Sequence, residues 1–183
     1  MIHPLNFYNE NDEIVLKEPC IGTKAFVAET ATLIGDVSLG EDVSIWYNTV
    51  LRGDVMPIEI GARSNIQDQC MLHGTFKQFA VKIGEEVTVG HGVTLHGCTI
   101  EDQCFIGMDS TIMDGVHIEK NCFVAAGSLL SPGKRFPSGS MIMGRPAKVV
   151  RELTDKEYKE FVASYKRYVK YKDCYLNNQT NEK

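Results

Sequence analysis

Aliphatic residues return about every six positions through most of this chain, and a small or β-branched residue precedes each of them by two places, as in Val87-x-Val89 and Val93-x-Leu95. A period of six fits neither an amphipathic helix nor a coiled-coil heptad. It does fit a short strand followed by a tight turn, three of which close one triangular coil. The pattern therefore predicts a mainly β protein whose coils stack in parallel, with the aliphatic side chains pointing into a prism.

Counting the inward residues in threes assigns each of them to one face of the predicted prism. Coils of this kind account for residues 21–150, and residues 1–20 form a lead-in before the first coil. The first face is predicted to carry Ile34, Leu51, Leu72, Leu95, Ile112 and Leu130. The second face is predicted to carry Ile45, Ile66, Val89, Ile106 and Val124.

The period of six ends near residue 150, and the chain then changes character. Thr154-x-x-Glu157 has the form of a capping box, which starts helices. Apolar residues beyond it recur at intervals of three and four, which predicts an α-helix over residues 151–175 with an apolar stripe packed on the prism. Residues 176–183 are polar and rich in Asn, so we expect a frayed tail there.

Composition narrows the function classes. A length of 183 residues suits one domain, and a hydrophobic content of 43% excludes a disordered or fibrous protein. The net charge of −5 gives no electrostatic basis for binding nucleic acid or an anionic membrane. Residues 1–20 lack the basic start and apolar middle of a signal peptide, and no apolar run is long enough to span a membrane. We therefore expect a cytoplasmic protein.

Four of the six cysteines occupy the small-residue position two places before an inward aliphatic residue. A free cysteine behaves as a small hydrophobic residue, so these four are predicted to be reduced core residues rather than disulfide partners. No CxxC pair is present, which argues against a cysteine zinc site. The four core cysteines are Cys70, Cys98, Cys104 and Cys122.

Two histidines are brought together by the repeat. His73 directly follows Leu72 and His96 directly follows Leu95, so both point outward from the first face, one coil apart. Parallel strands lie about 4.8 Å apart, which lets two such imidazoles converge on one ion at zinc–nitrogen distances of about 2.0–2.1 Å. A single outward histidine is usually only solvated. Two histidines in register therefore predict a metal site.

A third histidine, His91, follows the second face and cannot readily reach the same ion within one prism. Three prisms around a threefold axis would pack one face of each subunit against another face of the next. We therefore predict a homotrimer in which His73 and His96 of one subunit and His91 of its neighbour bind one metal ion. Three imidazoles with an open fourth position are typical of catalytic zinc.

Polar residues surround the predicted site at the matching positions of neighbouring coils. Arg52 lies one coil below His73, and Asp68 lies one coil below His91. Such residues can orient metal ligands and a metal-bound water, or they can form a surface ion pair at the trimer seam. The polar residues expected around the histidines are Arg52, Asp54, Gln67 and Asp68.

These motifs resemble those of the γ-class carbonic anhydrases and their carbonic-anhydrase-like relatives among hexapeptide-repeat proteins. The resemblance implies a left-handed parallel β-helix, and a trimer that binds Zn²⁺, or Fe²⁺ or another divalent metal, between subunits. A metal-bound hydroxide would then convert carbon dioxide to bicarbonate. The resemblance rests on Leu51-Arg52-Gly53-Asp54, Asn65-Ile66-Gln67-Asp68, His73, His91 and His96.

The same resemblance assigns further roles. Gln67 matches the residue that orients the hydroxide, and Asn65 matches a residue beside it. Arg52 and Asp54 match an intersubunit pair. Tyr168 matches a tyrosine near the family's site, although packing of the helix explains it equally well.

The chain departs from the family at the residues that export the proton. Val55 stands where the best-equipped members have a glutamate just after the Arg-x-Asp motif, and the segment 74–90 is too short to hold their acidic loop. The departure predicts slow or buffer-dependent turnover, or another substrate.

Two other functions fit the same repeat. Gly144-Arg145-Pro146-Ala147-Lys148 and the hexapeptide period also resemble acyl-CoA-dependent acyltransferases, in which a histidine acts as general base. A catalytically silent metal-binding trimer is the third possibility, since fold does not determine function.

Overall fold

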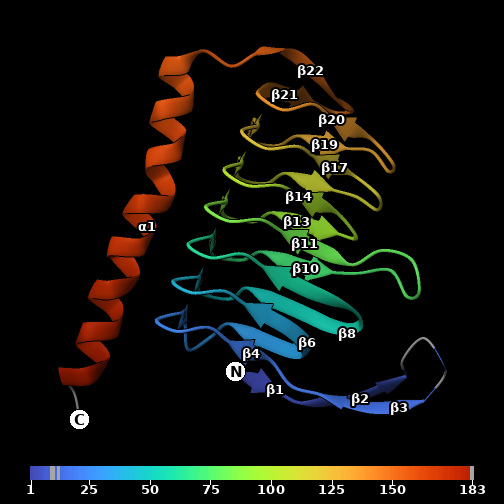
Figure 1. Cartoon of the computed structure of the whole chain (residues 1–183), viewed down its shortest axis with the longest axis vertical. Helices are drawn as coiled ribbons and strands as arrows, with labels where there is room; N and C mark the ends of the chain where they lie inside the picture. Colours follow the sequence, from blue (N-terminus) through green and yellow to red (C-terminus); the bar gives the residue numbers. More distant parts are fainter. Residues whose placement is uncertain (9–10, 12, 182–183) are drawn as a thin grey trace.

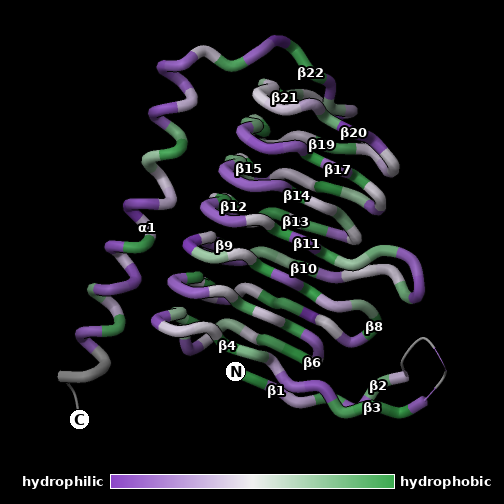
Figure 2. The backbone as a smooth tube through the Cα atoms, in the orientation of Figure 1, coloured by the Kyte–Doolittle hydropathy of each residue, from purple (hydrophilic) through white to green (hydrophobic). Residues whose placement is uncertain are grey.

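A computed structural model describes residues 1–8, 11 and 13–181 of the chain. Its short strands are wound into a parallel β-helix, and the long helix α1 (Asp155–Asn181) runs back along the outside of the stack of coils (Figure 1). The predicted fold, a parallel β-helix of hexapeptide repeats followed by a C-terminal α-helix, is confirmed. Hydrophobic and hydrophilic residues alternate along the coils, as the period of six requires (Figure 2).

The first face of the coil consists of parallel strands that pair in register along the whole stack. Leu51 pairs with Leu72, and Leu72 pairs with Leu95. All three side chains are fully buried, so the inward residues stack as the repeat predicts. The strands of this face are β6 (Thr32–Leu39), β8 (Val50–Ile60), β10 (Met71–His73), β13 (Thr94–His96), β16 (Thr111–Ile112) and β19 (Leu129–Leu130).

The second and third faces follow the same rule, and the predicted second-face column from Ile45 to Val124 is confirmed. The second face comprises β5 (Phe26–Val27), β7 (Ser44–Ile45), β9 (Asn65–Ile66), β12 (Thr88–Val89), β15 (Phe105–Ile106), β18 (Phe123–Val124) and β21 (Ser140–Gly144). The third face comprises β4 (Cys20–Ile21), the C-terminal ends of β6 and β8, β11 (Val81–Ile83), β14 (Thr99–Ile100), β17 (His117–Ile118) and β20 (Arg135–Phe136).

One inward assignment was wrong by a single residue. Leu33, not Ile34, pairs with Leu51 and is fully buried, whereas Ile34 pairs with Arg52 on the outward side. Because side chains in a strand alternate between faces, a shift of one residue reverses their direction. The small residue two places earlier identifies the correct position, since Ala31 is also fully buried.

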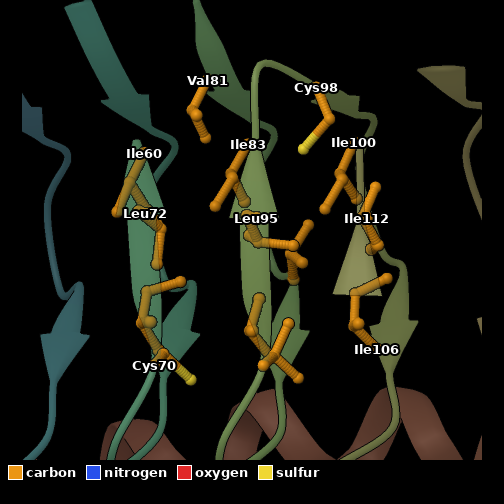
Figure 3. Packing of buried hydrophobic residues seen from close by; sticks show 14 of the residues in the cluster. Ile60, Cys70, Leu72, Val81, Ile83, Leu95, Cys98, Ile100, Ile106 and Ile112 are labelled. Atoms are coloured by element: carbon orange, nitrogen blue, oxygen red, sulfur yellow. The ribbon is translucent and has the colours of Figure 1, made fainter. Parts of the chain in front are cut away.

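The core is a column of aliphatic side chains with sulfur atoms between them. In Figure 3 the side chains of Cys70 and Cys98 lie among the inward aliphatic residues of neighbouring coils. All six cysteines are free. Burial raises the pKa of the Cys70 and Cys98 thiols to about 12, so both stay protonated at neutral pH. The prediction of reduced core cysteines is confirmed.

Antiparallel strand pairs lie at both ends of the stack. At the first coil, the lead-in strand β1 pairs in parallel with β6, so it belongs to the sheet. An antiparallel hairpin follows it (Figure 1). At the last coil, β21 turns back and pairs with an antiparallel strand. The strands at the ends are β1 (Ile2–His3), β2 (Leu5–Tyr8), β3 (Ile14–Lys17) and β22 (Ala147–Glu152).

The predicted capping box starts α1. The Thr154 N–H donates to Glu157 Oε2 at 3.0 Å, and the Glu157 N–H donates to Thr154 Oγ1 at 3.3 Å. The helix does not end near Tyr175 but continues to Asn181, so the predicted tail was wrong for residues 176–181. Leu176 packs against the core cluster, and neither Gly nor Pro stops the helix. The last two residues of the predicted tail lie outside the described residues.

Aromatic side chains of α1 pack against the second face of the prism. Phe161 packs against Phe105 and Phe123, with ring centroids 6.2 and 5.7 Å apart. Further along the helix, the buried Lys172 ammonium lies 2.7 Å from Asp42 at a corner of the coil. Within the part of the chain that the structure describes, no helix is both long and apolar enough to cross a membrane.

Candidate metal centre

His73 and His96 form a stacked pair on the first face. They are direct register partners on β10 and β13, as the repeat predicts. His73 Nδ1 lies 3.1 Å from His96 Nε2. Two nitrogens that each lie about 2.0–2.1 Å from a tetrahedral zinc ion are about 3.3 Å apart, so the separation of the pair suits a shared metal.

The outer nitrogen of each ring lies against a carboxylate. His73 Nε2 is 3.0 Å from Asp54 Oδ1, and His96 Nδ1 is 2.8 Å from Asp114 Oδ1. A carboxylate accepts the N–H of a neutral imidazole, and this fixes the tautomer of the ring. With both N–H groups turned outward, the two inner nitrogens face each other as acceptors. Two acceptor nitrogens that face each other can share a cation between them.

Burial favours the neutral form of His73. The pKa of its imidazole lies below its usual value chiefly because the ring is buried; the hydrogen bond to Asp54 opposes this shift, and Arg52 and His96 add to it. Lowering the pKa keeps the imidazole neutral, which is the form that binds metal. The donor set therefore fits a divalent metal ion that prefers imidazole nitrogen.

Asp54 links the pair to Arg52. Arg52 is the register partner of His73 one coil below, as predicted, and its guanidinium donates to Asp54 Oδ2 at 2.5 Å. The other oxygen of Asp54 is the one beside His73. Within one chain, Arg52 and Asp54 therefore pair with each other and orient a histidine, and their predicted contact across an interface stays a prediction.

Sequence reasoning missed Asp114. Its Oδ1 lies beside His96 and also accepts the Thr75 hydroxyl at 2.8 Å. Asp114 follows β16, the next strand above His96 in the stack, so it reaches the ring from one coil away. The signal was available: extending the first-face column by one coil places an acidic residue close to His96.

Removing the Asp114 carboxylate is expected to weaken metal binding by about 10- to 100-fold, the range typical of residues that orient a metal ligand. The variant is Asp114→Ala, and the measurement is competition for zinc against a chelator of known affinity. Glu160→Ala provides the control, because Glu160 is an exposed carboxylate on α1. Equal zinc affinity for the two variants would show that Asp114 does not support the site.

His91 lies in the turn after β12, at the edge of the second face, and it contacts a carboxylate of its own. Its Nδ1 is 2.8 Å from Asp68 Oδ2, and almost half of its side chain is exposed. Among the described residues, no three His, Cys, Asp or Glu side chains lie close enough to hold a metal ion. A centre with all three histidines therefore needs a second copy of the chain.

Gln67 and Asn65 are buried on the second face, close in sequence to Asp68. Gln67 Nε2 donates to Asn65 Oδ1 at 3.2 Å, and Asn65 Nδ2 donates to Thr88 Oγ1 at 3.0 Å. The two side chains thus lie beside each other, as the resemblance implies. They belong to the same face as His91, not to the face that carries His73 and His96.

Tyr168 packs on the second face from α1. Its ring meets Trp46 edge to face, with centroids 5.4 Å apart. Burial and the nearby Asp68 carboxylate raise the pKa of its hydroxyl. The ring contact is that of helix packing, and a catalytic role for Tyr168 stays a prediction.

Comparison with known proteins agrees with the fold. The family described as "Bacterial transferase hexapeptide (six repeats)" matches residues 97–132. A crystal structure of a candidate acetyltransferase from Bacillus cereus superposes with a TM-score of 0.86 at 45% identity, covering 96% of each chain. The hexapeptide-transferase family protein of Anaplasma phagocytophilum gives a TM-score of 0.82 at 42% identity, over 87% of this chain and 93% of that one.

Several relatives are named as carbonic anhydrases. The mitochondrial gamma carbonic anhydrase 2 of Arabidopsis thaliana is 46% identical over 158 residues, which are 84% of this chain but only 57% of the plant protein. The chain thus spans little more than half of that relative. The carbonic anhydrase of Geobacillus kaustophilus is 45% identical over 153 residues, and the alignment covers 84% of each chain. The chain belongs to the family of γ-class carbonic anhydrases and carbonic-anhydrase-like proteins, within the hexapeptide-repeat superfamily.

Proposed function

We propose that this protein is a homotrimer that hydrates carbon dioxide to bicarbonate at a divalent metal site between subunits. His73 and His96 of one subunit and His91 of its neighbour would hold the ion. The observation that carries the proposal is the pair of imidazole nitrogens 3.1 Å apart, each ring fixed by a carboxylate. Membership of the family supports the choice of reaction.

The carboxylates around the pair orient the histidine rings. Asp54 and Asp114 hold the two rings so that their inner nitrogens converge, and Asp68 holds His91 in the same way from the second face. When bound, zinc supplies the chemistry of the step, since it lowers the pKa of a coordinated water from about 15.7 to about 7. Gln67, fixed by Asn65, is our candidate for positioning the attacking oxygen by a hydrogen bond.

Metal analysis of the untagged protein, purified without chelator, tests the proposal first. We expect about one divalent ion per subunit, because a cyclic trimer has one such interface per subunit. Stopped-flow measurement of carbon dioxide hydration then tests the reaction. A protein that binds no metal but binds acetyl-CoA would refute the proposal, and a metal-loaded protein without activity above buffer would leave only the metal-binding trimer.

The proposed reaction also needs a route by which a proton leaves the metal centre. Val55 directly follows Asp54 and lines a pocket of about 240 Å³ together with Met56 and Phe76. The Lys17–Asp36 ion pair also belongs to the wall of this pocket. The side chain of Val55 has no acid–base group that could relay a proton. We therefore propose that protons leave through buffer molecules, which makes turnover depend on buffer concentration.

Val55→Glu is expected to raise turnover at low buffer concentration by about tenfold, because a positioned carboxylate relays protons, and such proton transfer commonly contributes about 10²–10⁴-fold. The measurement is the initial rate of carbon dioxide hydration as the buffer is diluted at constant ionic strength. Val55→Gln matches the size of glutamate without its acid–base chemistry. A gain with glutamine equal to that with glutamate would show that polarity, not proton relay, is responsible.

Acyl transfer is the second candidate, and one observation favours it. His117 Nε2 lies 2.6 Å from Glu101 Oε1, beside a pocket of about 430 Å³ on the third face. However, Arg135 Nη1 lies 3.3 Å from the other ring nitrogen, which leaves no nitrogen free to act as a base. The metal-dependent reaction therefore has the stronger structural support.

A further inference from the structure

A pocket lies between α1 and the second face, and it shares only Asp68 and Tyr168 with the residues assigned to the metal centre. Its volume is about 350 Å³, within the range of small-molecule sites. Most of its wall is aromatic, and it contains a single carboxylate. The lining residues are Trp46, Tyr47, Asp68, Tyr168, Tyr171, Cys174 and Tyr175.

The rings of this aromatic pocket stand at steep angles to one another. Trp46 meets Tyr168 at 81° and Tyr175 at 89°, and Tyr168 meets Tyr171 at 74°. In an edge-to-face contact the edge of one ring covers part of the face of the other, and Trp46 itself is buried. The rings that a ligand can reach are those of Tyr171 and Tyr175, which are 50% and 41% exposed.

Asp68 gives the pocket a negative charge in a fixed place. Its Oδ1 accepts the Tyr47 backbone N–H at 3.2 Å, and its Oδ2 lies 2.8 Å from His91 Nδ1. Lys172 on α1 does not pair with Asp68, because its ammonium is bonded to Asp42 and Asp173. Arg167, also on α1, acts electrostatically on Tyr168 but is exposed to solvent. The Asp68 carboxylate is therefore the charged group of the pocket lining.

We propose that this pocket binds a small alkylated ammonium ion, such as a trimethylammonium group. Aromatic faces attract cations through their quadrupole, and an alkylated ammonium needs few hydrogen bonds. A bare divalent metal is a poorer ligand, because hard cations require six or more oxygen ligands, and one carboxylate with tyrosine rings does not provide them. Anions are opposed by Asp68.

Trp46 provides a direct signal, since it is the one tryptophan of the chain and lines the pocket. Titration with choline chloride, against sodium chloride of equal ionic strength, is expected to change its fluorescence and to saturate. The uncharged 3,3-dimethylbutan-1-ol has the shape of choline and is expected to give no saturable change. An equal response to both compounds, or a response to neither, would overturn the proposal.

Variants of Tyr171 separate cation–π binding from apolar packing. Tyr171→Phe keeps the ring and should bind choline like the unaltered protein, whereas Tyr171→Leu should raise the dissociation constant about three- to thirtyfold. Tyr8→Leu is the control, because Tyr8 is exposed on β2, far from α1 (Figure 1). Unchanged binding by Tyr171→Leu would refute the assignment of the pocket.

Cysteine labelling gives a second readout on the same protein. Cys174 lines the pocket, whereas Cys20 is exposed on β4 outside it. Choline should slow alkylation of Cys174 and leave Cys20 unaffected, as measured by mass spectrometry of the peptides. Both readouts should persist after metal is removed by a chelator, so this proposal can fail or stand independently of the proposed reaction. Equal protection of both cysteines, or of neither, would contradict it.

Discussion

His73→Ala is expected to abolish metal binding and to lower carbon dioxide hydration by more than about a hundredfold, because changing a residue that merely orients a ligand already costs about 10- to 100-fold. His73 is the most buried of the three histidines and lies against both His96 and Asp54. Its removal takes away one donor and leaves Asp54 without the ring that it orients. Metal content and hydration rate should therefore fall together.

His117→Ala is the matched control for that experiment. His117 is also a half-buried histidine on a strand of the prism and also lies beside a carboxylate, Glu101. It lies on the third face, away from the pair of His73 and His96. Metal content should remain that of the unaltered protein. If both variants lost metal equally, the loss would reflect the stability of the fold and not a donor at position 73.

The period of six was sufficient to predict the stacking of His73 and His96. In a parallel coil, each residue pairs with its counterpart one coil away, so position in the repeat determines position in space. The same reasoning placed Arg52 below His73. It was wrong at Ile34, where two aliphatic residues stand side by side and the sequence offers both as inward residues. Alternation along β6 selects Leu33.

Side chains that reach diagonally between coils were harder to predict. Asp114 contacts His96 from the turn after β16, and Thr75 reaches the same carboxylate from the segment after β10. Backbone register places α-carbons, whereas these contacts depend on rotamers and on the path of a turn. The length of α1 was underestimated for a related reason. Leu176 is fixed by tertiary packing, which a polar composition conceals.

The six-residue period cannot predict the distance from His91 to the histidines of a neighbouring subunit. The repeat determines distances within one prism, and it correctly separates His91 from the other two histidines, since His91 lies with Asp68 beside the second face. The distance between faces of different subunits depends on how the prisms pack, which no period within one chain encodes. The shared site is therefore best tested by an experiment on subunits rather than on residues alone.

Mixing His73→Ala subunits with His91→Ala subunits is expected to restore activity that neither variant has alone. A site between subunits is intact when its first subunit keeps His73 and its second keeps His91. In a randomly mixed cyclic trimer at equal amounts, about one quarter of the sites satisfy both conditions, because each interface is head-to-tail. Activity and metal content should both reach about a quarter of the unaltered values after joint refolding.

Mixing His73→Ala with His96→Ala distinguishes a shared site from a general rescue by mixing. These two residues are register partners on one chain and face the same ion. Every interface in that mixture lacks one of them, so no site can be whole. Recovery in the first mixture but not in the second requires His91 to come from the neighbouring subunit. Recovery in both, or in neither, would rule out the arrangement proposed for the metal centre.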